Sequence, residues 1–230
     1  MWSVKLVALA GAVALLGGCF IIGSGRGSTV DAVPDEMKRT RLHVPDIDDA
    51  YPYGHTGLKP GQWAKFAVRR EAGDLVMRIG VVKADGDKLW IEVVEETDVR
   101  AASARLVGPD GIVSKALYRE VGPAGASDIL PQKIAQRAET DPAGVGEETV
   151  EAREIEFLGA KRKAAIVKVV HRDEALGRSE TEETVWCDVP GLYASSKHGG
   201  LGKRTSEREK LTVEMIEHGD GYVPVIPDPK

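Results

Sequence analysis

The sequence contains no asparagine and only two cysteines among its 230 residues, and it has no excess of positive charge. Without asparagine, N-glycosylation is excluded and tight turns must be built from glycine, aspartate and proline. Lysine and arginine total 31 against 36 aspartate and glutamate residues, a formal net charge of −5. A chain of this charge repels a phosphate backbone, so we expect no nucleic-acid partner.

The start of the chain has the pattern of an export signal. Lys5 precedes an uncharged run, residues 6–16, which is typical of a secretory leader. The following residues, Leu16 to Cys19 (LGGC), resemble the lipobox of bacterial lipoproteins. The resemblance implies cleavage between Gly18 and Cys19 and attachment of diacylglycerol to the Cys19 thiol, with fatty acids such as palmitate as the membrane anchor. The alternative is an uncleaved helix, because the apolar run continues through Ile22.

This interpretation divides the chain into four parts. We predict a signal peptide over 1–18, a lipidated cysteine and flexible tether over 19–60, an antiparallel β domain over 61–220 and a C-terminal tail over 221–230. Removing the leader, which holds only one charged residue, leaves 30 basic against 36 acidic residues. If Cys19 carries lipid, Cys187 has no cysteine to pair with, so stability must come from packing.

Alternation of apolar and polar residues predicts most of the secondary structure. Two short turn sequences, Ala72 to Asp74 and Asp85 to Asp87, separate the first alternating segments and favour hairpins. We predict strands over 64–68, 75–81, 89–93 and 112–121, and later over 155–157, 165–169, 184–189 and 211–215. We expect loops over 160–163, 173–179 and 198–209.

Helix signals are sparse. Ser127 and Asp128 offer a cap, Pro131 suits a first turn, and the apolar spacing that follows predicts a helix over 131–139. A single further turn is expected over 35–41. The predicted fold class is therefore mainly β (α+β): a curved antiparallel sheet or half-barrel with one or two short helices.

Residues capable of catalysis are present but not in a convincing arrangement. Cys187 and His171 are a conceivable nucleophile and base, but Cys187 alternates with apolar neighbours and is better read as a buried strand residue. His171 and His218 each precede a nearby aspartate, too few ligands for a zinc site. We therefore expect no metal, no cofactor and no enzymatic activity.

Two groups of charged residues are better explained by exposure to solvent than by a functional site. The alternating glutamates Glu92, Glu95 and Glu96, and likewise those over 180–183, indicate solvated sheet faces rather than acid–base pairs. The basic stretch 197–210 lacks the spacing of a phosphate-binding loop and is read as a solvated loop.

Three tryptophans lie on predicted strands. Trp63, Trp90 and Trp186 either fill the core or line a hydrophobic cavity, and we retain them as candidate cavity-lining residues.

Two segments give the chain a resemblance to a known family. The first is 61–66 (GQWAKF), which begins a predicted meander, and the second is the late strand 182–191 (EETVWCDVPG), which continues into 192–197. The chain resembles bacterial envelope proteins of the outer-membrane lipoprotein carrier and receptor (LolA/LolB-like) superfamily. The resemblance implies an incomplete barrel whose concave side, closed by helices, holds acyl chains. It carries over no ligand residue, and it departs from the family in having one convincing helix.

These observations favour a non-enzymatic, lipid-anchored protein on the periplasmic face of the outer membrane. Phe20 and Ile21 follow the cysteine without an aspartate, which fits release to the outer membrane. The expected ligand is an acyl chain or a lipidated client protein. The alternative is a structural or assembly lipoprotein whose sheet edge or acidic surface docks another envelope protein.

Overall fold

The computed structural model describes residues 44–49, 51, 55, 57–136, 146–173 and 177–230. The predicted leader, Cys19, the expected turn of helix over 35–41 and His43 lie outside these residues. In the described part of the chain no helix is long and apolar enough to cross a membrane.

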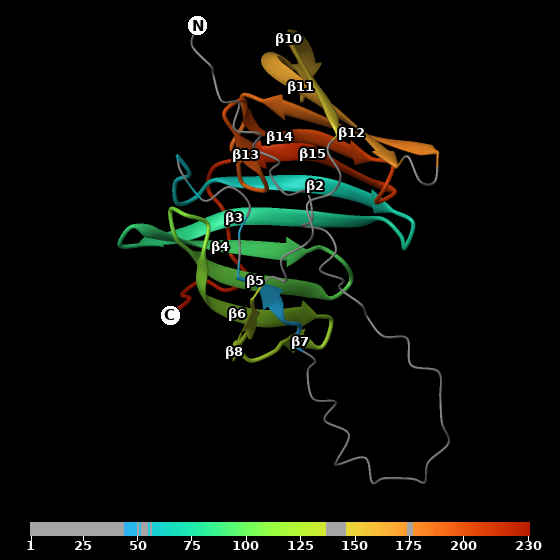
Figure 1. Cartoon of the computed structure of the whole chain (residues 1–230). Coiled ribbons are helices and arrows are strands. Elements are labelled where there is room, and N and C mark those ends of the chain that lie inside the picture. Colours follow the sequence, from blue (N-terminus) through green and yellow to red (C-terminus); the bar gives the residue numbers. More distant parts are fainter. Residues whose placement is uncertain (1–43, 50, 52–54, 56, 137–145, 174–176) are drawn as a thin grey trace, which may run out of the picture.

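A 13-stranded sheet forms most of the molecule (Figure 1). Its strands follow the order β10-β11-β12-β14-β15-β2-β3-β4-β5-β6-β7, with β13 added beside β14 and β8 beside β6. The first half of the chain supplies β2 (Trp63–Arg70), β3 (Leu75–Asp85), β4 (Lys88–Glu95), β5 (Arg100–Val107), β6 (Val113–Gly122), β7 (Gly125–Ala126) and β8 (Leu130–Pro131). The second half supplies β10 (Glu147–Phe157), β11 (Ala160–Asp173), β12 (Arg178–Cys187), β13 (Ser195–Ser196), β14 (Gly199–Ser206) and β15 (Leu211–Gly219).

The sheet consists of two antiparallel meanders joined through one strand pair. β15 at the end of the chain pairs with β2 at its beginning, with Met215 opposite Phe66. Most neighbours in each meander are joined by short turns, as expected for antiparallel hairpins, but a longer connection that contains β13 joins β12 to β14. The outermost strands, β10 and β7, do not pair with each other, so the sheet is curved but open.

The main core lies on one face of this sheet, which we call the inner face. Phe66, Ile79 and Ile91 are buried there together with Val213 and Trp186. Residues from β12 and from β6 belong to the same cluster although many strands separate them in the sheet, so the sheet curls toward this face. The predicted half-barrel is confirmed.

Short segments cover the inner face. β1 (Ile47–Asp48) and β9 (Ile134–Ala135) form a small parallel pair, and Ile47 and Tyr51 are buried in the core. The loop after β12 adds Leu192, which is completely buried. The packed unit thus begins before the predicted domain boundary at residue 61.

The C-terminal residues cover part of the opposite, outer face. Ile226 is fully buried in a second cluster with Trp90, Val94, Ala102 and Ala104. Residues 221–230 therefore pack on the sheet.

Three sequence-based expectations about secondary structure are wrong. No helix occurs in the described part of 131–139, because Leu130–Pro131 and Ile134–Ala135 pair with β6 and β1. An isolated helix of that length is marginal, and tertiary pairing overrides its caps. The loops expected over 160–163 and 198–209 are largely strand, in β11 and β14, and Arg100–Val107 is a strand that the alternation did not reveal.

Candidate functional site

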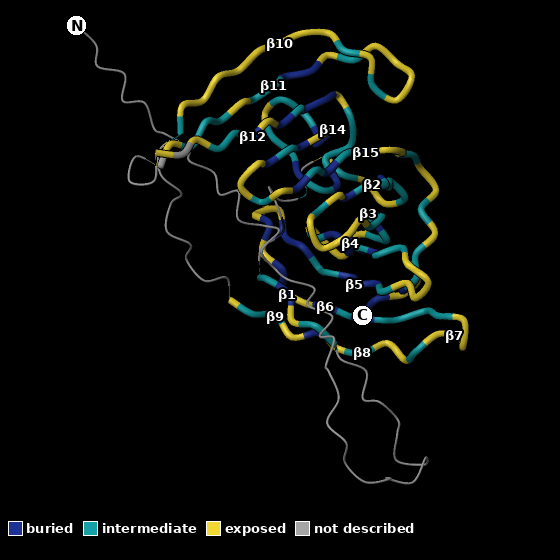
Figure 2. Tube along the Cα trace, turned by 90° about the vertical axis from the view of Figure 1, so that its right-hand side faces the viewer, coloured by how far each residue is buried: buried dark blue, intermediate teal, exposed yellow. Residues whose placement is uncertain are grey.

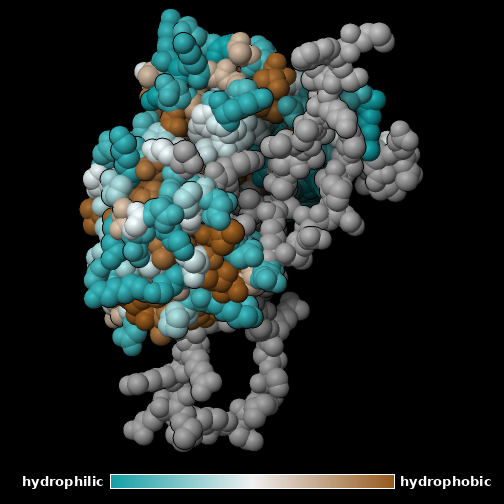
Figure 3. Space-filling view, turned by 60° about the vertical axis from the view of Figure 1, so that its left-hand side comes forward, coloured by the Kyte–Doolittle hydropathy of each residue, from teal (hydrophilic) through white to brown (hydrophobic). Residues whose placement is uncertain are grey.

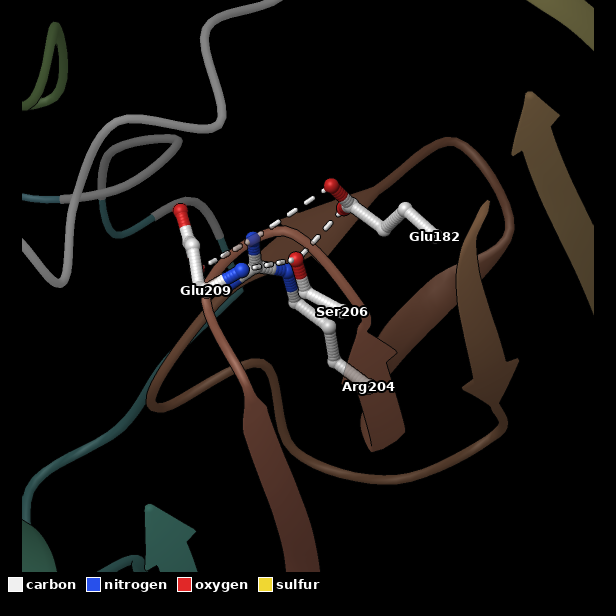
Figure 4. Close-up of polar contacts among 4 residues, drawn as sticks. All are labelled: Glu182, Arg204, Ser206 and Glu209. Atoms are coloured by element: carbon white, nitrogen blue, oxygen red, sulfur yellow. Dashed lines mark hydrogen bonds and ion pairs between the residues drawn. The ribbon is translucent and has the colours of Figure 1, made fainter. Parts of the chain in front are cut away.

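A buried ion network lies at the inner-face side of β12 and β14. Figure 4 shows the Arg204 guanidinium between the carboxylates of Glu182 and Glu209. Arg204 Nε lies 3.0 Å from Glu182 Oε1, and Arg204 Nη2 lies 2.9 Å from Glu209 Oε2. Ser206 Oγ accepts the Glu209 backbone N–H at 3.2 Å.

Burial governs the chemistry of this network. Arg204 and Glu182 are each only 8% exposed. Burial alone lowers the pKa of Arg204, but hydrogen bonds and charges from Glu182 and Glu209 outweigh it, so the net pKa lies above the ordinary value. Because the guanidinium bridges the two carboxylates, the network holds β12, β14 and the turn before β15 together.

A second polar group lies on the same inner face around Arg105. Arg105 Nε donates to Ser103 Oγ at 3.3 Å, and Ser103 in turn donates to the buried Gln132. The Tyr51 hydroxyl donates to the Leu192 carbonyl. Burial lowers the pKa of Arg105 and raises the pKa of Tyr51, and the two groups interact electrostatically.

The inner face is thus filled by the chain's own residues and contains buried charge. The Tyr193 ring packs against Phe66 with centroids 5.3 Å apart. An acyl chain entering here would have to displace these buried rings from the core, which costs free energy.

The tail is held on the outer face by Glu92. This carboxylate is completely buried and accepts three hydrogen bonds, from the Tyr222 hydroxyl at 2.5 Å, the Val225 N–H at 2.9 Å and the Ile226 N–H at 2.6 Å. The Tyr222 ring lies over Gly80, where a Cβ would come within 2.3 Å of it. Burial, followed by the charge of Glu92, raises the pKa of Tyr222.

Two of the glutamates expected on solvated faces are therefore buried. Glu92 and Glu182 lie inside because each has its own donors, whereas Glu183 is exposed as expected. The sequence held a signal for Glu92, since the surrounding segment Leu89–Val94 is otherwise continuously apolar, typical of a strand covered on both faces.

The three tryptophans do not line one common surface. Trp186 lies in the inner core. Trp90 is 1% exposed in the outer cluster, and Trp63, partly exposed, donates from Nε1 to the Asp220 carbonyl at 3.3 Å. Trp63 and Trp90 thus belong to the face covered by the tail, and Trp186 to the opposite face.

Cys187 and His171 are far apart. Cys187 pairs with Ala164, seven residues along β11 from His171, which corresponds to roughly 23 Å. The cysteine is completely buried, and burial raises the pKa of its thiol despite an opposing effect of Arg162. His218 contacts Arg162, with Nε2 3.2 Å from Nη2. The described residues contain no cluster of three potential metal ligands.

The most exposed element is β10, at the outer edge of the second meander. Every residue from Glu147 to Glu154 is exposed, on both faces (Figure 2). In the described part of the chain β10 pairs only with β11, so its other side carries free backbone groups. Neither this exposure nor this edge position was predicted, because alternation does not reveal a strand's place in a sheet.

Comparison with known proteins finds similar solved structures but no similar sequence. No protein-family model matches the chain, and no curated protein matches its sequence. Among solved structures, MucB in complex with the periplasmic part of MucA aligns with 15% identity and a TM-score of 0.43, covering 74% of this chain and 54% of that one. The MucA/MucB complex of Pseudomonas aeruginosa aligns with 16% identity and a TM-score of 0.41, covering 71% and 53%. The chain spans about half the length of these MucB chains, and similarity at this level assigns no function to it.

Proposed function

We propose that this chain is a non-enzymatic, lipid-anchored envelope protein that faces the periplasm from the outer membrane and docks another envelope protein. The lipobox ending at Cys19 supports the anchor, and the residues after it support the outer membrane. The wide separation of Cys187 from His171 supports a function without nucleophilic catalysis.

Docking is preferred over acyl-chain carriage because of the inner face. A carrier needs an apolar space, but Tyr51, Leu192 and Tyr193 pack over the sheet there, and the Arg204 network places charge among them. The observation that favours docking is this filled inner face together with the long exposed strand β10 at one end of the sheet.

Two measurements test the proposal. Cells grown with a labelled fatty acid should yield labelled wild-type protein, and Cys19→Ser should abolish both the label and the membrane fraction. Native mass spectrometry of the wild-type protein released from membranes should show complexes with another protein. Protein that carries only a stoichiometric free lipid would contradict docking, and an unlabelled wild-type protein would contradict the anchor.

A further inference from the structure

The edge strand β10 has a geometry suited to pairing with another strand. It runs for 11 residues in unbroken register with β11, without the bulge that interrupts β3, β5 and β15. A regular edge of this length presents a continuous row of N–H and C=O groups on its outer side. In Figure 1 β10 and β11 project beyond the rest of the sheet.

The two ends of the sheet differ in how their edge strands are protected from further pairing. At the far end, β6 carries the short strands β7 and β8, and β8 ends with Pro131, which cannot donate to a ladder. By contrast β10 contains neither proline nor lysine, the residues that commonly blunt an edge. Only the β10 end is open along a full strand in the described part of the sheet.

The charge of β10 defines what can pair with it. The strand contains five glutamates and one arginine. Glu147 is bonded to Arg172 at 2.9 Å and Glu151 lies 3.6 Å from Arg153, both on one face. The other face carries, in order, Glu148, Val150, Ala152, Glu154 and Glu156. On β11, Lys163 lies opposite Glu154, Lys161 opposite Glu156 and Val169 opposite Glu148.

This second face also offers apolar contact. Val150 is 50% exposed and lies opposite Val167, while Ala152 lies opposite Ala165. Figure 3 shows hydrophilic residues dominating the top of the molecule, where β10 lies, with a few hydrophobic ones among them. On this face of β10, the apolar side chains of Val150 and Ala152 therefore lie between carboxylates.

We propose, building on the docking function above, that β10 binds an extended basic segment of another envelope protein, which adds a strand to the sheet. Backbone hydrogen bonds supply the attachment, apolar residues of the partner lie on Val150 and Ala152, and its lysines or arginines face Glu148, Glu154 and Glu156. A second copy of this chain fits poorly, because antiparallel pairing of β10 with itself about Ala152 places Glu148 directly opposite Glu156.

A synthetic peptide tests this surface directly. The probe has the length of β10. On one face it carries lysines opposite Glu148, Glu154 and Glu156 and valines opposite Val150 and Ala152, and its other face carries threonine. Its binding to the chain starting at residue 20 is measured by fluorescence anisotropy. The triple variant Glu148→Lys, Glu154→Lys, Glu156→Lys should bind at least about tenfold more weakly, since three attractive pairs become repulsive. The matched control, Asp74→Lys, Asp87→Lys, Asp98→Lys, changes the same net charge at exposed positions in other strands' turns and should bind as the wild type does.

A second probe separates strand addition from simple charge attraction. The same peptide N-methylated at alternate residues keeps its charge but loses the donors along one side, so we expect binding to fall to the level of the triple variant. Equal weakening by the control variant, unchanged binding of the N-methylated probe, or a concentration-dependent dimer in place of peptide binding would each overturn the inference. If the peptide fails while native mass spectrometry still finds a protein partner, the docking function stands and its assignment to β10 falls.

Discussion

The strands β4 and β10 belong to the same sheet, yet β4 is buried on both faces and most of β10 is exposed on both. In β4, Ile91 faces the inner core while Trp90 and Glu92 lie under the C-terminal tail. In β10, eight consecutive residues are exposed and backbone pairing to β11 is the main attachment. Buried apolar contacts are thus concentrated in the middle of the sheet, and we expect β4 to contribute far more to stability than β10.

Removing the buried guanidinium should produce the largest loss of stability. We expect Arg204→Ala to lower the free energy of unfolding by about 3–5 kcal/mol, because Glu182 is left as a buried, uncompensated charge. Urea denaturation followed by circular dichroism measures the change. Restoration of stability by the pair Arg204→Met with Glu182→Leu would support this cause, and a loss under about 1 kcal/mol for Arg204→Ala would contradict it.

A cavity made by shortening a core side chain of β4 should cause the next largest loss of stability. Ile91→Ala removes a completely buried side chain from the inner core and should cost about 2–5 kcal/mol. The same denaturation experiment applies. A cost near zero would mean that the inner face is loosely packed, and would reopen the possibility of an internal ligand.

Displacing the tail should have an intermediate effect. In Gly80→Ala the added methyl group meets the Tyr222 ring, so we expect a loss of about 1–3 kcal/mol and faster proteolysis near the C-terminus. The double variant with Tyr222→Ala should lose less than the two single variants combined, because the clash is removed. Strict additivity would show that Gly80 and Tyr222 do not contact each other.

Changes on β10 should have the smallest effect. Val150→Ala and, separately, Arg172→Ala should each alter the free energy of unfolding by less than about 0.5 kcal/mol, because the first side chain is half exposed and the second forms an exposed ion pair. Thermal unfolding compared with wild type is sufficient to measure this. A decrease of more than about 2 kcal/mol in the free energy of unfolding would indicate that β10 belongs to the cooperative core. It would then contribute to stability as β4 does.

The sequence predicted the strands of the sheet better than the segments that pack over its two faces. Alternation around Phe66, Ile79 and Ile91 located the first meander, since an inward face must be apolar wherever one side is buried. It missed β5, whose outward positions Ala102 and Ala104 are small because the tail packs over them. The tail that covers β5 comes from a distant part of the chain, so its packing produces no alternation of apolar and polar residues in the sequence of β5 itself.

The candidate site was less predictable still. Glu92 and Glu182 were expected in solvent because an isolated glutamate in a strand usually points outward, and only the folded chain reveals the Ile226 N–H and the Arg204 guanidinium that satisfy them. The acidic character of residues 147–156 was visible in the sequence, but its position at the sheet edge depends on β15 pairing with β2 and leaving β10 outermost.

Photocrosslinking in intact cells is the most direct test of partner binding at β10. A photoreactive amino acid replaces Val150 on β10 or, as a control, Ile112, which is exposed in a turn elsewhere. We expect a crosslink to an envelope protein from position 150, lost in the background of Glu148→Lys with Glu154→Lys, and none from position 112. A crosslink of equal strength from both positions, or one from position 150 that survives the charge reversals, would contradict it.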